Sequence, residues 1–235
     1  MKYLHLFVLS GCLLLIALPA FLHAQESEYL NAGSAQPGWE PLPLELPPPL
    51  FVGTPKDIVT PNLEPVTGKN RKPFLAPKGI KNIALGKPVS SSAASPKIGT
   101  LKQLTDGDKR GSDGSFIEID SGVQYVQIDL GAPQLIHAIL LWHYHMEARV
   151  YYDVVVKTSD DPDFITNVKT LFNNDHDNSA GLGVGKNKEY IETNEGKLIE
   201  GNGTKARYLR LYTNGNTSNT LNHAIEVEVY AQPAP

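Results

Sequence analysis

Hydrophobic and polar residues alternate in several short segments of the C-terminal two thirds of the chain. A period of two places every second side chain on one face, which predicts β-strands with one buried side. The segments are 125–130, 208–212 and 225–230. Their predicted inward positions are Val126, Ile128 and Leu130; Leu209 and Leu211; and Ile225, Val227 and Val229.

Two further runs, 136–142 and 150–156, are almost continuously apolar and predict central strands that are buried on both faces. Clusters of Gly, Asn and Asp separate the runs and predict turns. No segment after the first 24 residues shows a convincing 3.6-residue period. The pattern therefore predicts an antiparallel two-sheet sandwich over 78–232, and about 155 residues suffice for a core without disulfides.

The N-terminus has the pattern of an export signal over residues 1–24. Lys2 precedes an apolar stretch from Leu4 to Leu22, and Ala24 stands before the first polar run. Two alternatives remain open: a lipoprotein cleavage box ending at Cys12, and an uncleaved membrane anchor. After cleavage we expect no membrane insertion, and the expected location is secreted, periplasmic or in the cell envelope.

Residues 25–77 hold 11 of the 18 prolines. Proline fixes φ and removes a backbone donor, so we expect extended geometry in which neither helix nor sheet propagates. One interpretation is a linker that holds the sandwich away from a surface. The other is a strap that packs on the sandwich, because Leu50–Val52 and Phe74–Leu75 are apolar for a solvated linker.

Charge and cysteine content exclude several classes of protein. The formal net charge of −4 argues against a nucleic-acid partner, which would require a basic face. The one cysteine lies in the apolar N-terminal stretch, so the rest of the chain has no disulfide, zinc-thiolate site or catalytic thiol. Residues 233–235 are a short tail.

Five motifs occur in order: Asn82–Val89, Leu104–Asp108, Val126–Gly131, Ala206–Leu211 and Glu226–Tyr230. Together they resemble the discoidin family, the type C domain of coagulation factors five and eight, over about 80–232. The resemblance implies an all-β, antiparallel jelly-roll sandwich of the galactose-binding-like class, similar to bacterial carbohydrate-binding modules. The cysteine pair that often joins the family's ends is absent, and Tyr125 replaces a tryptophan.

The same resemblance implies a structural calcium ion. In the family a tight acidic turn holds the ion together with a glutamate of the last strand, here Asp106, Asp108 and Glu226, with carbonyl groups near Gln103 and Asp108. Calcium takes six to eight oxygen ligands, which such a turn can supply. Without the resemblance, the same residues indicate only a solvated turn and an edge-strand glutamate.

A second group of candidates follows the apolar run that ends at Trp142. His143 and His145 share a face if the chain stays extended, and Tyr144 offers an aromatic face. Arg149 lies where fucose-binding lectins of the superfamily place a sugar-contacting arginine. Asp175 and His176, in a loop rich in Asn, Asp and Gly, complete the predicted ligand-binding set: His143, Tyr144, His145, Arg149, Asp175 and His176. Ordinary packing of each histidine is the alternative.

No nucleophile elbow, zinc-protease motif, phosphate loop or dinucleotide fingerprint is present. We therefore expect no enzyme, but an exported binding module for carbohydrate or extracellular glycan with a structural calcium ion. A protein-adhesion or envelope-scaffold domain, with a protein partner, is the alternative. A small metallohydrolase built from the two histidines, Asp175 and Asp177 is a third reading.

Overall fold

The computed structural model describes residues 37–51, 55 and 57–235. The export signal predicted for residues 1–24 lies outside the described residues. No helix among the residues described has the length and apolar character needed to cross a membrane.

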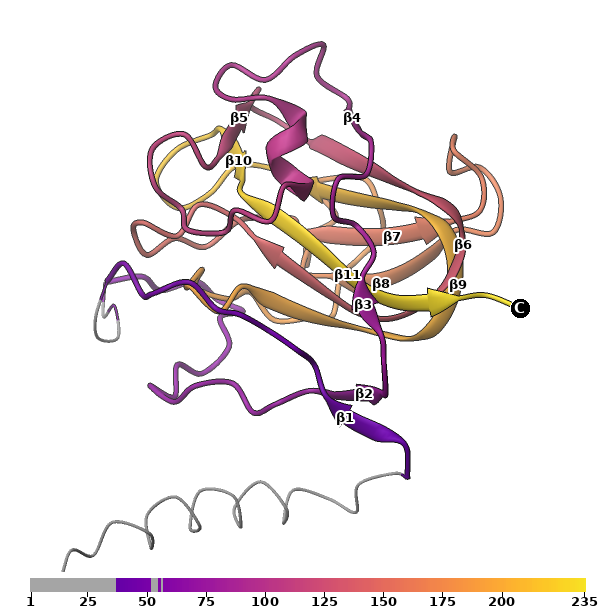
Figure 1. The fold of residues 1–235 in the computed structure, drawn as a ribbon. Helices are drawn as coiled ribbons and strands as arrows, with labels where there is room; N and C mark the ends of the chain where they lie inside the picture. Colours follow the sequence, from indigo (N-terminus) through magenta and orange to yellow (C-terminus); the bar gives the residue numbers. More distant parts are fainter. Residues whose placement is uncertain (1–36, 52–54, 56) are drawn as a thin grey trace, which may run out of the picture. The chain divides into compact units, whose positions relative to one another are not determined.

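The described chain is built from strands and one short 3-10 helix, η1 (Leu101–Thr105) (Figure 1). The strands are β1 (Trp39–Pro41), β2 (Leu75–Pro77), β3 (Lys81–Asn82), β4 (Val89–Ser91), β5 (Ile117–Ile119), β6 (Gln124–Trp142), β7 (Val155–Ser159), β8 (Lys169–Asn173), β9 (Lys197–Thr213), β10 (Asn222–Ala224) and β11 (Glu226–Pro233). All paired strands of the main sheet run antiparallel, in the order β3-β11-β6-β9-β7-β8 with β4 beside β6. The predicted all-β antiparallel jelly roll is confirmed.

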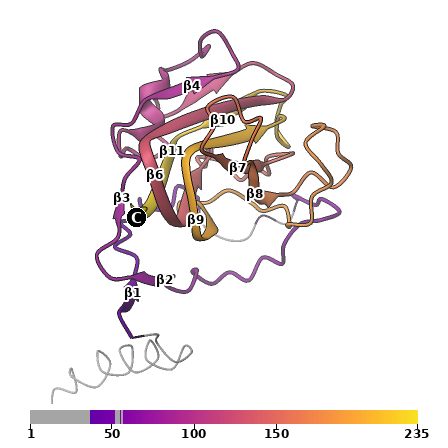
Figure 2. The same ribbon diagram turned by 90° about the vertical axis from the view of Figure 1, so that its right-hand side faces the viewer.

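Two long strands, β6 and β9, form both layers of the sandwich. Their pairing is interrupted by register shifts between Asp129 and Gln134 and between Ile136 and Ala138. The first half of β6 pairs with β4 and with the second half of β9, which also pairs with β7. The second half of β6 pairs with β11 and with the first half of β9. Figure 2 shows both strands bending from one layer into the other.

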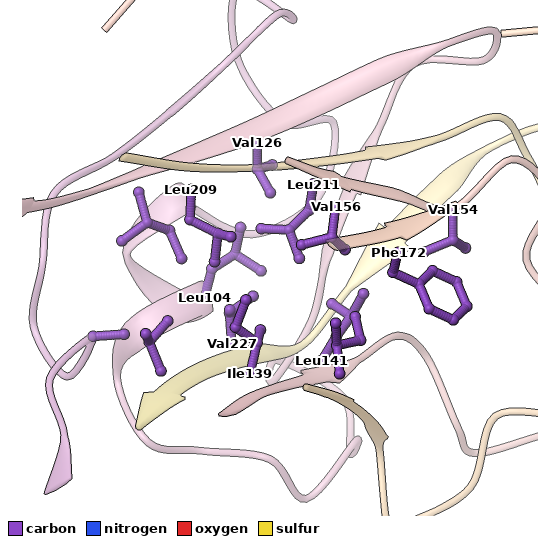
Figure 3. Packing of buried hydrophobic residues seen from close by; sticks show 14 of the residues in the cluster. Leu104, Val126, Ile139, Leu141, Val154, Val156, Phe172, Leu209, Leu211 and Val227 are labelled. Carbon is purple, nitrogen blue, oxygen red and sulfur yellow. The ribbon is translucent and has the colours of Figure 1, made fainter. Parts of the chain in front are cut away.

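The main core lies between these layers (Figure 3). Val126, Leu209 and Val156 come from one layer, and Ile139 and Val227 come from the other. The period-two prediction is confirmed for 125–130 and 208–212, whose predicted inward residues are all buried in this cluster.

Two sequence predictions were wrong in detail. Ile225 packs in a second cluster outside the main core, because its backbone amide bonds to the carbonyl of Trp142 just before β11 begins. The run 150–156 forms a strand only from Val155, although Val150, Tyr151 and Val154 are buried. Val150 and Tyr151 make isolated bridges instead, because they connect the loops at one end of the sandwich.

The second cluster covers the outer face of the layer formed by β11 and the second half of β6. Ala138, Leu140 and Trp142 project from β6 to this face, opposite to Ile139 and Leu141. Leu42, Ala76 and Ile80 pack there, with Leu44 and Phe74 partly buried beside them. The described part of the proline-rich segment thus packs as a strap, and its β1 and β2 pair with each other, so sheet pairing does occur where none was expected.

Candidate functional site

Several loops meet at one end of the sandwich. Val155, at the start of β7, pairs with Tyr212 near the end of β9 and with Asn173 at the end of β8. The segments 143–154, 174–196 and 214–221 therefore leave the strands at the same end, where β5 and β10 also lie (Figure 1). Val150 bridges to Ile191, and the amide of Thr217 bonds to the carbonyl of Val150. Segment 150–154 holds these loops together.

Aromatic rings form a continuous group at this end. His143 stacks on Tyr151 with 4.3 Å between ring centroids and 16° between planes. Tyr144 meets Phe116 edge to face at 5.0 Å and lies 5.9 Å from His223. Such contacts stabilise the group beyond simple burial.

Two carboxylates anchor the histidines of this group. Glu192 Oε1 lies 2.5 Å from Nδ1 of His143, and both side chains are almost fully buried. His223 lies between the hydroxyl of Tyr151, 3.1 Å from Nδ1, and Glu118, 3.1 Å from Nε2. Burial lowers the pKa of His223 and raises the pKa of Tyr151. Because the hollow beside His143 and His223 measures only about 20 Å³, it has room for a water molecule but not for a sugar ring.

Arg149 lies beside this group but is 9% exposed, whereas the sequence predicted a loop arginine open to ligand. Its guanidinium lies 4.5 Å from the ring centroid of Tyr144, a cation–π contact, and its Nη2 donates to Glu147 at 2.9 Å. The Glu147 side chain is 66% exposed, and Tyr144 is partly exposed. Of this part of the predicted site, Tyr144 and a small fraction of Arg149 are accessible, and they lie beside Glu147, which was not predicted.

His143 and His145 do not share a ligand position, contrary to the face-sharing prediction. His145 is fully buried, and its Nε2 lies 3.0 Å from the carbonyl of Lys109, whereas His143 contacts Glu192 and Tyr151. A Cβ built on Gly111 would lie 3.0 Å from the ring of His145 and 3.3 Å from Leu50 of the strap. His145 therefore packs between the acidic turn and the strap.

Asp175 and His176 lie in a separate loop that its own side chains organise. The Asp175 carboxylate accepts hydrogen bonds from the amides of Ser179 and Ala180, both at 3.0 Å. Burial, and then the nearby charge of Asp153, raise the pKa of Asp175. His176 is half-buried, and its Nε2 is buried without a hydrogen-bond partner among the described residues.

Among the described residues, one group of three acidic side chains could jointly hold a metal ion: Asp153, Asp175 and Asp177, with one oxygen from each within 4.8 Å of the others. The two histidines of the metallohydrolase reading do not belong to this group. Asp153 was not predicted from the sequence. Its φ of 51°, unusual for a residue other than glycine, turns it toward Asn214 and Ser179, and no local pattern signals that geometry.

The acidic turn lies against the start of β11, as the resemblance implied. Oε2 of Glu226 accepts a hydrogen bond from the amide of Gly107, while Oε1 is buried and has no hydrogen-bond partner. Burial, and then repulsion by Glu228 and Asp106, raise the pKa of Glu226 to about 8. A buried carboxylate with a free oxygen beside another carboxylate fits a bound cation, because the cation would supply the missing partner.

Asp108 plays a different part in the turn. Its carboxylate accepts hydrogen bonds from the guanidinium of Arg110, at 2.9 Å, and from Ser115. The bonds from Arg110 lower the pKa of Asp108 to about 2. Its side chain is already paired, so only its backbone carbonyl remains for a cation.

Comparisons with known proteins found distant similarities of fold among solved structures. No family model and no curated protein matches the sequence. The CBM32 module of AlyQ, solved with 4,5-unsaturated mannuronic acid, is similar in structure with 22% identity, a TM-score of 0.46, and coverage of 60% of this chain and 92% of that one. A Streptococcus pneumoniae fucose-binding module, SpX-3, is 16% identical with a TM-score of 0.46, over 65% of this chain and 99% of that one.

A family 89 glycoside hydrolase from Clostridium perfringens is 18% identical with a TM-score of 0.48, over 65% of this chain but only 15% of that one. The similar region is a small part of that hydrolase. The likeness to these structures concerns the fold alone.

Proposed function

We propose that the protein is an exported, non-enzymatic module that binds carbohydrate through the accessible residues at the loop end of the sandwich. The observation that carries the proposal is the stack of the Arg149 guanidinium on the ring of Tyr144, 4.5 Å apart, beside the exposed carboxylate of Glu147. The expected location is outside the cytoplasm, in the periplasm, envelope or medium.

The chemistry of this group suits a sugar. Each hydroxyl of a sugar can both donate and accept a hydrogen bond, and the guanidinium supplies donors while the carboxylate supplies acceptors. The exposed part of Tyr144 gives an apolar surface for the C–H groups of the ring. Because Arg149 is held by Tyr144 and Glu147 before any ligand binds, little side-chain ordering opposes binding.

Glycan-array binding by the 25–235 chain tests the proposal. Tyr144→Leu and Glu147→Gln should each weaken binding at least tenfold, since each removes one recognition element. Arg207→Ala is the matched control, because Arg207 also lies over a tyrosine ring, 4.9 Å from that of Tyr208, and pairs with Asp129 away from the loop end. If both loop-end variants keep full glycan affinity, the proposed site is wrong.

We further propose that the acidic turn holds a structural calcium ion. Asp106 and Glu226 would supply carboxylate oxygens, and carbonyl groups of the turn would supply others. The support is the free, buried Oε1 of Glu226 together with the adjacent negative charge of Asp106. Bound there, calcium would join the turn to β11.

A further inference from the structure

A cleft of about 690 Å³ lies between the proline-rich strap and one edge of the sandwich. Residues 64–71 of the strap form one wall, residues 190–191 and 193–198 form the other, and Phe51 also lines it. Sites for small molecules measure about 300–1,000 Å³, so this cleft has the right size for several sugar units. The hollow beside His143 and His223, at about 20 Å³, does not.

The two walls are joined directly, so the cleft is preformed. Lys197 Nζ donates to Glu64 Oε2 at 2.8 Å. The Arg71 guanidinium donates to the carbonyls of Gly196, at 2.8 Å, and Glu195, at 3.0 Å, and its backbone amide donates to the Glu195 carboxylate. Because these contacts fix the spacing of the walls, a ligand would not have to order them.

The same contacts use up most of the charge in the cleft. The Lys197 ammonium pairs with Glu64 and also lies 4.5 Å from the ring centroid of Tyr190. The positive charge of Arg71 faces the carbonyl oxygens of Gly196 and Glu195, while the Glu195 carboxylate accepts the backbone amide of Arg71. An ionic ligand would compete with these partly buried pairs, whereas a neutral ligand could bind without separating them.

Neutral polar groups and apolar surface line the rest of the cleft. Thr67, Asn70 and Thr193 offer hydroxyl and amide groups, and Phe51 and Val66 offer apolar surface. Lys69, at the rim, is exposed and remains hydrated. We propose that this cleft is a second ligand site, which binds an uncharged segment of a glycan chain. The class of ligand rests on the proposed function. The site itself does not include the loop-end residues.

Blocking the cleft with a bulky side chain tests the site. Val66 lines the cleft and is 45% exposed, so Val66→Trp can fill it without disturbing the core. Val59→Trp is the matched control, because Val59 is on the same strap, is 83% exposed and does not line the cleft. The measurement is calorimetric titration of the 25–235 chain with neutral tetrasaccharides of galactose, N-acetylglucosamine and mannose.

We expect Val66→Trp to weaken binding at one site at least tenfold and to lower the stoichiometry from two ligands to one, with no change in Val59→Trp. Unchanged stoichiometry and affinity in Val66→Trp would overturn the proposal, as would tighter binding of a uronic-acid tetrasaccharide at the cleft.

Tyr144→Leu separates the two sites. If Tyr144→Leu binds normally while Val66→Trp does not, the cleft stands and the loop-end site fails; the opposite result removes the cleft alone.

Discussion

The backbone amide of Gly107 donates a 3.1 Å hydrogen bond to Oε2 of Glu226, 119 residues later in the chain. This bond fastens the acidic turn to the first residue of β11. The second oxygen of the same carboxylate is buried without a partner, so the contact is only half satisfied by the protein.

Calcium should therefore raise the melting temperature of the 25–235 chain. A ligand that binds only the folded state adds about 2.7 kcal/mol at a hundredfold excess over Kd. Glu226→Gln should remove most of that gain, because the amide lacks the charge that attracts the ion. Thermal unfolding in chelator and in millimolar calcium measures the effect; equal melting temperatures in the two would exclude the site.

Without calcium, the stability of the protein should fall as the pH rises from about 4.5 to about 8. The pKa of Glu226 is raised in the folded state, from an ordinary 4.5 to about 8, so between these values the folded protein binds more protons than the unfolded chain. The free energy of unfolding must then decrease with pH. Urea unfolding of the wild type and Glu226→Gln at pH 5 and pH 8 isolates this group, since other groups cancel in the difference; equal slopes in both proteins would contradict the prediction.

Leu42→Ala should destabilise the sandwich although residue 42 lies in the proline-rich segment. Leu42 is 8% exposed and packs with Trp142 and Ile225 in the second cluster, and a buried Leu→Ala change costs about 2–5 kcal/mol. Leu46→Ala, at a residue that is 45% exposed, is the control and should change stability by less than about 0.5 kcal/mol. Chemical denaturation compares them, and a neutral Leu42→Ala would mean that the strap does not support the fold.

Removal of the strap should alter the environment of Trp142. The 78–235 fragment lacks Trp39, so its tryptophan fluorescence reports Trp142 alone, which is fully buried in the intact chain. We expect a red-shifted emission and binding of a hydrophobic dye, because the outer faces of Ala138, Leu140 and Trp142 lose their cover. A fragment with the emission and stability of the 25–235 chain would show that the sandwich is complete without the strap.

Arg149→Ala should lower stability as well as glycan affinity. The arginine is largely buried against Tyr144, so its removal loses packing and a cation–π contact, together about 1–3 kcal/mol. For this reason Tyr144→Leu and Glu147→Gln are better tests of binding. Thermal unfolding of Arg149→Ala measures the effect, and an unchanged melting temperature would show that the Arg149 side chain does not stabilise the folded protein.

The strands were predictable because alternation reports directly which side chains face the core, and Val126, Ile128, Leu209 and Leu211 all lie there. Ile225 belongs to another cluster because a local backbone bond to Trp142, not its place in the alternation, decides its direction.

The candidate site was less predictable, because its contacts join residues far apart in the sequence. Glu192, which holds His143 from 49 residues away, follows no motif. The burial of Arg149 and His145 also depends on neighbours, such as Tyr144 and the Lys109 carbonyl, whose positions only the tertiary fold fixes. At the acidic turn a family motif supplied the long-range contact, since the amide of Gly107 bonds to Glu226; the calcium ion between Asp106 and Glu226 stays a prediction.

The passage of β6 and β9 through both layers has a mechanical consequence. Neither layer is an independent sheet, because each contains one half of β6 and one half of β9, which are 19 and 17 residues long. Pulling one layer away would strip hydrogen bonds from the same strands in the other. The two layers should therefore unfold together when the domain is heated or pulled. Calorimetry should record one transition.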